Sequence, residues 1–587
     1  MSRTKVKKKL ASLPKKLGIL KIYRVLSNKV RLYIWLLLSC LIITSITELI
    51  GIASIIPLIN SITNENQSNF GFLNNLISYI HRYSGLQQIQ IFGIVVIILI
   101  SISYFARILS NYFTLYTASE IGLFLHNKSI KNYLNSSYDN QLGALSDNLT
   151  YCLSQQINQV VSGYIFQWLN AISSIIIFAA LSGGLFIIAP QITIIFVLVT
   201  FIFYFLIGLP FLKYLANGSK KLNTSLDEHL SILSGLKWYL KQLNLYNLEN
   251  IFFKRLSSLQ KDIRTYTVRK NFIGTYPKTI LEFFIIIAAI VIVTFSDVNS
   301  SKQNISQLIF LLIIMQKLFP VFQTLYVAWT NIVANKHSRD DVLQYCNSNN
   351  IKKKQGILIS SDDIKYINID KMSYCYRKGI ENVFTNISLK FHINDYYHIS
   401  APSGYGKSTL IDLILGLQLP TKGNITYVGS KIKFNANEII TGEFISYVPQ
   451  VNFYLDGSIK SILKSHYIEQ NITDHNILKA CKAANINQVI NKLPNGINTF
   501  CRNNLSELSG GQKQRFAIAQ ALLNPNLRMI ILDETLSNID KSTSKSILEN
   551  IKYFYPHIGI ILVTHDSSIV TEDFIEIKLK NFSKDII

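Results

Sequence analysis

The chain has 587 residues, of which 49% are hydrophobic, and its mean hydropathy is +0.26. This length is too great for one compact core, and so apolar a composition excludes an ordinary soluble protein. The formal net charge of +24 allows either nucleic acid or an anionic membrane surface as a partner, and the placement of the basic residues decides between them.

The basic residues at the N-terminus precede a long apolar segment. Residues 1–31 contain eleven Lys and Arg and no acid. Such a run is typical of a cytoplasmic anchor beside anionic lipid headgroups, with a solvated tail as the alternative for residues 3–16. We therefore expect a lipid bilayer as a partner and no nucleic acid.

Six apolar stretches follow before about residue 335. A bilayer core takes about 20 helical residues to cross, and each stretch is long enough. They cover residues 32–60, 89–117, 162–188, 191–215, 277–295 and 305–332. The sequence therefore predicts six transmembrane helices.

The loops between these stretches predict the topology. Residues 217–271 hold ten Lys and Arg against four acids, whereas the loops on the other side carry few charges of either sign. Positive loops stay in the cytoplasm. We therefore expect cytoplasmic N- and C-termini and two long, helical cytoplasmic loops at about 118–161 and 216–276.

Charged side chains interrupt the apolar stretches at four positions: Glu48, Arg107, Glu282 and Lys317. A charge in hydrocarbon is costly and usually faces a cavity or a partner, so these residues are candidates for lining a substrate path. For the last three, a position near the membrane surface is the alternative. Pro57 and Pro320 are expected to kink their helices. Residues 72–83 predict either an amphipathic surface helix or a packed loop helix, because their apolar positions share one helical face.

The second half of the chain contains a phosphate-binding pattern. Residues 401–409 read APSGYGKST, between a strand-like run at 396–400 and a helical pattern at 410–417. This is the context of a P-loop, in which backbone N–H groups and a helix N-terminus hold phosphates. Ala401 departs from the pattern, which normally has glycine there. The candidate nucleotide-binding residues are Ser403, Gly404, Tyr405, Gly406, Lys407, Ser408 and Thr409.

Four further motifs follow the P-loop. Gln450 and His565 each follow a strand-like run. Asp533 and Glu534 end an apolar strand, where Asp533 is expected to hold Mg²⁺ and Glu534 to orient or deprotonate the attacking water. An LSGGQ sequence at 508–512 opens a helix whose N–H groups can bind an anion. Its candidate residues are Ser509, Gly510, Gly511 and Gln512.

In this order the five motifs resemble those of ABC-type ATPase domains over about residues 365–580. The resemblance implies ATP and Mg²⁺ as cofactors, with Lys407 on the β- and γ-phosphates. It implies catalytic roles for Glu534, His565 and Gln450. It also implies that Ser408, Gln450 and Asp533 contact the metal. By the same resemblance, Tyr376 stacks on adenine, and Tyr374 is the competing choice.

Two segments depart from the family pattern. Asn538 replaces the usual alanine in the D-loop-like sequence at 537–540. Residues 499–505 replace the T-x-V-G-E-x-G pattern that precedes LSGGQ in exporters. Because that segment touches the membrane domain in relatives, its effect on coupling is left open.

The predicted fold is an α-helical membrane domain of the ABC exporter type followed by an α/β P-loop nucleotide-binding domain. Its predicted parts are a basic N-terminus (1–31), a transmembrane domain (32–335), a linker (336–362) and the ATPase domain (363–587). In the ABC family, two ATPase domains enclose two ATP molecules, each between one P-loop and the other LSGGQ. One copy of each motif therefore implies a second subunit, either an identical copy or, as the alternative, a different chain.

The substrate is narrowed by resemblance alone. Segments at 48–57, 277–282 and 317–320 resemble those of bacterial lipid-linked-oligosaccharide flippases and polysaccharide exporters. A multi-pass protein of the bacterial inner membrane that moves a glycolipid is the resulting expectation. Export of a peptide, bacteriocin or lipid is the alternative, and drug efflux stays open. An ATP-gated channel or regulatory membrane protein is disfavoured, because such proteins tend to lose one active site and Glu534 and His565 are both intact.

Overall fold

The computed structural model describes most of the chain. The described residues are 18–55, 88–136, 138, 141, 149–188, 190–295, 303–346, 364–376, 382–402, 404–429, 433–436, 438, 441–467 and 470–579. Contacts divide the chain into two compact units, Met1–Ser136 with Asn140–Ile351, and Ser137–Asp139 with Lys352–Ile587. Pro57, Ser403 and residues 72–83 lie outside the described residues.

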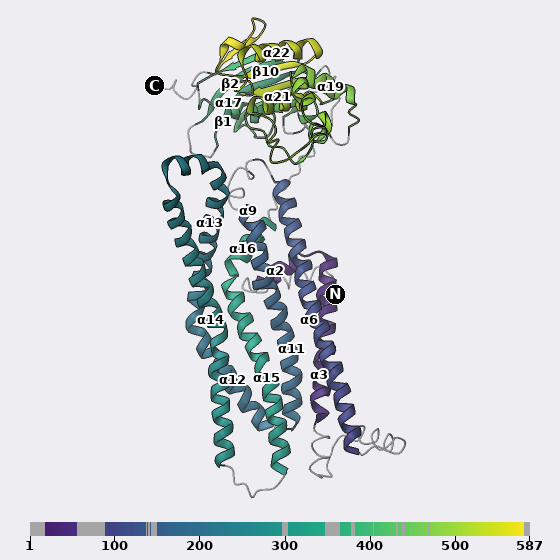
Figure 1. The fold of residues 1–587 in the computed structure, drawn as a ribbon, viewed down its shortest axis with the longest axis vertical. Helices are drawn as coiled ribbons and strands as arrows, with labels where there is room; N and C mark the ends of the chain where they lie inside the picture. The colour runs from purple at the N-terminus through teal and green to yellow at the C-terminus, as the bar shows by residue number, and fades with distance from the viewer. Residues whose placement is uncertain are drawn as a thin grey trace. The chain divides into compact units, whose positions relative to one another are not determined.

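The first unit is helical throughout its described residues (Figure 1). Its helices before residue 189 are α2 (Gly18–Val25), α3 (Asn28–Ala53), α6 (Gln88–Leu134), α9 (Leu149–Tyr151), α10 (Ile157–Val160) and α11 (Phe166–Ile188). Those after it are α12 (Pro190–Gly208), the 3₁₀ turn η3 (Leu209–Phe211), α13 (Leu212–Tyr246), α14 (Glu249–Phe295), α15 (Gln303–Ala334) and α16 (Lys336–Cys346). In this unit α3 packs on α6, α11 on α15, and α13 on α14.

Four helices of the described residues are long and apolar enough to cross a membrane. They are Asn28–Ala53, Gly93–Leu134, Cys152–Phe186 and Thr193–Phe211, which match the first four predicted spans. The fifth and sixth predicted spans fall in α14 and α15 and stay predictions. The chain is therefore a multi-pass membrane protein.

Helices continue through most of the two loops that we expected to be helical. α6 runs on to Leu134, and α13 and α14 cover the second loop except for two residues, where Asn247 ends α13 in a left-handed conformation (φ 50°). Two π-helical turns, η1 (Cys152–Gln156) and η2 (Val161–Ile165), interrupt the third long helix. The sequence pattern did not predict these turns, because a single inserted residue leaves the apolar content unchanged.

The second unit contains a five-stranded parallel sheet in the order β11-β3-β10-β9-β6. Its strands are β3 (Tyr396–Ser400), β6 (Ile445–Val448), β9 (Met529–Asp533), β10 (Gly559–Val563) and β11 (Ile575–Lys578). β9 and β10 are buried along their whole length, as expected for apolar strands covered on both faces. A four-stranded antiparallel sheet is formed by β1 (Ile364–Tyr374), β2 (Phe384–His392), β4 (Lys422–Gly429) and β5 (Lys433–Asn435).

Helices and short turns complete this unit (Figure 1). The helices are α17 (Lys407–Ile414), α18 (Ile459–Lys464), α19 (Asp474–Ala483), α20 (Asn487–Asn491), α21 (Gly510–Ala521) and α22 (Lys541–Phe554). The 3₁₀ turns are η5 (Thr441–Glu443), η6 (Gly496–Asn498) and η7 (Ser567–Ile569), and a short β7 (Gly457–Ser458) pairs with β8 (Phe500–Cys501). Because β3, β6, β9 and β10 are parallel, the residues after them meet at one edge of the sheet, where ligands bind in folds of this type.

Candidate nucleotide-binding site

The P-loop joins β3 to α17 at that edge. Gly406 precedes α17 with φ 85°, and a Cβ there would lie 2.7 Å from Val383 and 2.9 Å from Phe384, so only glycine fits. Ala401 is buried, and its carbonyl oxygen accepts a hydrogen bond from Lys407 Nζ at 3.1 Å. The methyl group at the position of the missing glycine therefore packs inside the domain.

Three of the predicted site residues contact the Glu534 carboxylate. Gln450 Nε2 donates to Glu534 Oε2 at 2.9 Å, and His565 Nε2 lies 3.2 Å from Glu534 Oε1. Lys407 Nζ lies 3.5 Å from the same Oε1 and also contacts the His565 ring. Glu534 itself has a left-handed backbone (φ 50°), and its N–H donates to Val563 O at 2.9 Å. Three side chains from separate segments of the chain thus contact one carboxylate.

Asp533 lies beside this network and has a partner that the sequence analysis missed. Tyr447, on β6, donates its hydroxyl hydrogen to Asp533 Oδ2 at 3.1 Å. Burial raises the pKa of Asp533, while the Tyr447 hydrogen bond and the charge of Lys407 oppose that rise. β6 and β9 are neighbouring strands, and Tyr447 pairs with Ile531, two residues before Asp533. The alternation of side chains along the two strands was therefore the signal in the sequence that places Tyr447 and Asp533 on the same face of the sheet. The hydrogen bond gives Tyr447 a role in orienting this carboxylate.

Tyr376 and Tyr374 are distinguished by burial. Tyr374, the last residue of β1, is 5% exposed, whereas Tyr376 is 58% exposed. The Tyr376 hydroxyl lies 2.5 Å from Thr409 Oγ1, on the P-loop helix, and its ring lies edge-on to Tyr374. Only the Tyr376 ring has a face open to a ligand, which favours it over Tyr374 as the adenine-stacking residue.

We expect Tyr376→Ala to weaken ATP binding by about ten- to a hundredfold, because stacking of a base on an aromatic ring contributes about 1–3 kcal/mol. Tyr376→Phe keeps the ring and loses only the Thr409 contact, so its affinity should stay close to that of the wild type. Titration with a fluorescent ATP analogue measures both variants. Equal affinity of Tyr376→Ala and wild type would place the adenine elsewhere.

The LSGGQ segment forms its own cap. Ser509 precedes α21, its Oγ accepts a hydrogen bond from Gln512 N at 3.4 Å, and Gln512 Oε1 accepts one from Ser509 N at 2.9 Å. This reciprocal pair is a capping box. The Ser509 hydroxyl keeps its own hydrogen to donate to an anion at the helix N-terminus. Among the described residues, no hydrogen bond or ion pair joins this segment to the P-loop of the same chain.

The comparisons with known proteins agree with this geometry. A family model described as ABC transporter matches residues 384–537. The chain contains an ABC transporter ATP-binding domain. A domain of this kind implies ATP binding and ATPase activity.

Relatives extend the likeness to the membrane domain. A putative ABC transporter ATP-binding protein of Mycoplasma pneumoniae is 26% identical over 565 residues, 93% of this chain and 86% of that protein. The lactococcin-A transport/processing ATP-binding protein of Lactococcus lactis is 32% identical over 240 residues, so this chain spans 33% of its length. The solved structure of a bacterial Atm1-family ABC exporter with ATP bound covers 95% of both chains with a TM-score of 0.75 and 15% identity. The ABC domain therefore follows a helical membrane region in an exporter-type fold.

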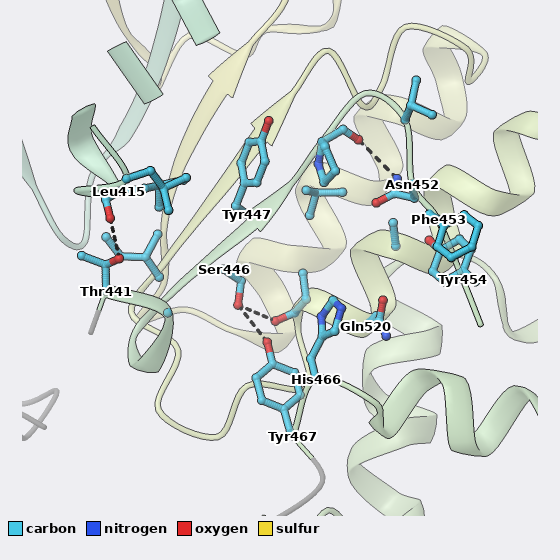
Figure 2. Close-up of a pocket in the computed structure, with 18 residues that line it drawn as sticks. Leu415, Thr441, Ser446, Tyr447, Asn452, Phe453, Tyr454, His466, Tyr467 and Gln520 are labelled. Atoms are coloured by element: carbon cyan, nitrogen blue, oxygen red, sulfur yellow. Dashed lines mark hydrogen bonds between the residues drawn. The ribbon is translucent and has the colours of Figure 1, made fainter. Parts of the chain in front are cut away.

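An open pocket of about 540 Å³ lies behind the Gln450 loop of the ABC domain. Figure 2 shows it between Leu415 and Thr441 on one side and Asn452, Phe453 and Tyr454 on the other. Beside it, Val451 is 82% and Phe453 is 79% exposed. Apolar side chains this exposed indicate an interaction surface. The sequence analysis missed it, although alternating apolar residues directly after Gln450 were the signal.

The divergent segment before LSGGQ, residues 499–505, forms hydrogen bonds with the loop that follows Gln450. Asn503, Asn504 and Leu505 all have left-handed backbones, with φ of 49°, 60° and 52°. Asn504 Oδ1 accepts a hydrogen bond from Tyr454 N at 2.7 Å, and Asn503 N donates to Asp456 Oδ1 at 2.9 Å. Asparagine tolerates this conformation better than most residues, which explains why asparagine occupies positions 503 and 504.

Proposed function

We propose that the chain is one subunit of an ATP-driven exporter. The observation that carries the proposal is the shared Glu534 carboxylate, contacted by Gln450, His565 and Lys407. In the proposed reaction the P-loop N–H groups and Lys407 bind the ATP phosphates. Glu534 takes the proton from the attacking water, and His565 and Gln450 hold Glu534 in position.

The donor set supports Mg²⁺ at this edge of the sheet. Asp533, Gln450 and Ser408 offer a carboxylate, an amide and a hydroxyl oxygen, and oxygen ligands of this kind suit Mg²⁺. Tyr447 fixes one oxygen of the buried Asp533 carboxylate. When bound, Mg²⁺ supplies positive charge beside the β- and γ-phosphates. Ser403 to Thr409 and Tyr376 complete the proposed nucleotide site.

A second copy of the chain is part of the proposal. The hydrogen bonds of Ser509 and Gln512 stay within the start of α21, so this segment is available to the ATP bound by another subunit. Gly510 and Gly511 add backbone N–H groups at the same helix end. With all catalytic residues intact in one chain, a homodimer of two identical sites is favoured over a heterodimer.

We propose a bacterial inner-membrane location with both termini in the cytoplasm, on the basis of the basic loops. The domain boundaries proposed from sequence are 1–31, 32–335, 336–362 and 363–587. ATP closes the dimer and hydrolysis reopens it, so that the membrane cavity faces alternate sides. The proposed coupling segments are near 138–147, which lies largely outside the described residues, and near 234–243, within α13. The exposed apolar residues beside Gln450 support an interaction role for that loop.

The proposed substrate is an amphipathic glycolipid, such as a lipid-linked oligosaccharide, moved out of the cytoplasmic leaflet. The lactococcin transport proteins among the relatives favour a second candidate, peptide export. An ATP-gated channel is disfavoured, because Glu534 and its partners are all present.

Purified protein in liposomes tests the proposal. We expect ATP to drive the flipping of a fluorescent lipid-linked oligosaccharide across the bilayer. We also expect this lipid to stimulate ATP hydrolysis, because the catalytic residues lie in one network. A Glu534→Gln preparation is the control, and transport that survived it would contradict ATP-driven turnover. Stimulation by a leader-type peptide without stimulation by glycolipid would favour the peptide exporter instead.

A further inference from the structure

Three helices of the membrane unit bring charged side chains together. Arg107, on α6, lies 3.3 Å from Glu48 on α3, measured from Nη1 to Oε1. Lys317, on α15, donates from Nζ to the Tyr104 hydroxyl at 2.8 Å, and its Nζ lies 4.7 Å from the centre of the Tyr104 ring. Tyr104 and Arg107 are one turn apart on α6, so the two contacts are adjacent.

The charges in this cluster do not balance. Among the described residues, Arg107 and Lys317 contribute two cations to it, and Glu48 contributes one carboxylate. The Glu48 side chain is 11% exposed, whereas the Arg107 side chain is 42% exposed. A cation in a membrane segment is costly unless it faces water or an opposite charge. The cluster is therefore suited to an additional anion.

A second charge pair of the membrane unit gives the contrast. Lys278 and Glu282 lie 3.7 Å apart, one turn apart on α14. This pair is neutral and belongs to a single helix, so it has no unbalanced charge for a ligand. It provides a matched control for the cluster.

We propose that Arg107 and Lys317 bind the phosphate group of an amphipathic lipid, and that Glu48 holds Arg107 when the lipid is absent. This inference rests on the proposed exporter function and names the chemical class of its substrate. A phosphate accepts hydrogen bonds from a guanidinium fork and an ammonium group at once. The neighbouring side chains of Ile102, Phe105 and Ile108 on α6 are apolar and exposed. They offer contact to lipid chains but no partner for the backbone of a peptide.

Direct binding tests the site without ATP. Full-length protein is placed in neutral phosphatidylcholine nanodiscs and titrated with a radiolabelled polyprenyl phosphate, with the uncharged polyprenol as competitor. We expect Lys317→Gln to raise the half-saturating concentration by about tenfold or more, since the variant loses a charge-assisted hydrogen bond to the phosphate. Lys317→Arg keeps the charge and should restore most of the affinity. Lys278→Gln should leave it unchanged.

Glu48→Gln separates a ligand site from a structural ion pair. If Glu48 competes for Arg107, its loss should lower the half-saturating concentration severalfold. A purely structural pair predicts weaker binding and a lower melting temperature for the same variant. Equal binding of polyprenyl phosphate and polyprenol to wild type, or preference for an acidic amphipathic peptide, would overturn the inference. If the wild-type protein bound polyprenyl phosphate but did not transport lipid with ATP, the exporter proposal would be wrong and the phosphate site would still be supported.

Discussion

Glu534→Gln should lower the rate of ATP hydrolysis about a thousandfold, because a general base contributes about 10²–10⁴ in rate and an amide cannot take up the proton. The amide keeps the size of the carboxylate. ATP binding should therefore persist, and slow turnover should trap ATP on the protein. Steady-state phosphate release and retention of radiolabelled ATP measure the two effects.

A control for this variant lies in the same domain. Glu576, on β11, is ion-paired with Lys578 at 3.2 Å and belongs to none of the contacts around the nucleotide site. Glu576→Gln should keep wild-type turnover. If Glu534→Gln hydrolysed ATP within about threefold of wild type, the general-base role that we propose for Glu534 would be wrong.

Four of the five motifs could be placed from the sequence because each follows a parallel strand, whereas LSGGQ lies at the start of α21. The sequence shows apolar runs before Ser400, Gln450, Asp533 and His565, and parallel strands place their carboxyl ends at one edge. The family model and the structural likeness confirm the fold and the ATP-binding domain. Local patterns were sufficient for this much, since the central strands β9 and β10 are almost entirely apolar and are buried along their length.

Two features of the structure could not be predicted in the same way: the exact end of a strand and the contacts between distant residues. Tyr374 and Tyr376 are two positions apart, so strand alternation assigns them to the same face. Only the end of β1 at Tyr374 separates the buried Tyr374 ring from the exposed Tyr376 ring. The pairing of Glu48 with Arg107 depends on how α3 packs on α6. Charge composition identified these residues as unusual in a membrane segment but could not supply a partner. Roles assigned to single site residues stay predictions.

Lys407 is the residue whose loss should most weaken ATP binding. Its side chain is 8% exposed, and its Nζ donates to Ala401 O at 3.1 Å, so the ammonium group is enclosed by the P-loop. Charge-assisted hydrogen bonds to phosphate are about twice as strong as neutral ones, and each charged bond contributes about 1.5–3 kcal/mol. We expect Lys407→Ala to raise the dissociation constant for ATP by about a hundredfold.

Two further variants identify the cause of this loss. Lys407→Arg keeps the charge, but a planar guanidinium does not fit the enclosed position of a compact ammonium group, so binding should recover only in part. Lys390→Ala removes a lysine that packs 3.9 Å from the Tyr366 ring, outside the P-loop, and should bind ATP as wild type does. Isothermal titration with ATP and Mg²⁺ measures all three. Unchanged affinity of Lys407→Ala would contradict the assignment of residues 401–409 as the phosphate-binding loop, because no other cation contacts the Glu534 carboxylate from that loop within the described residues.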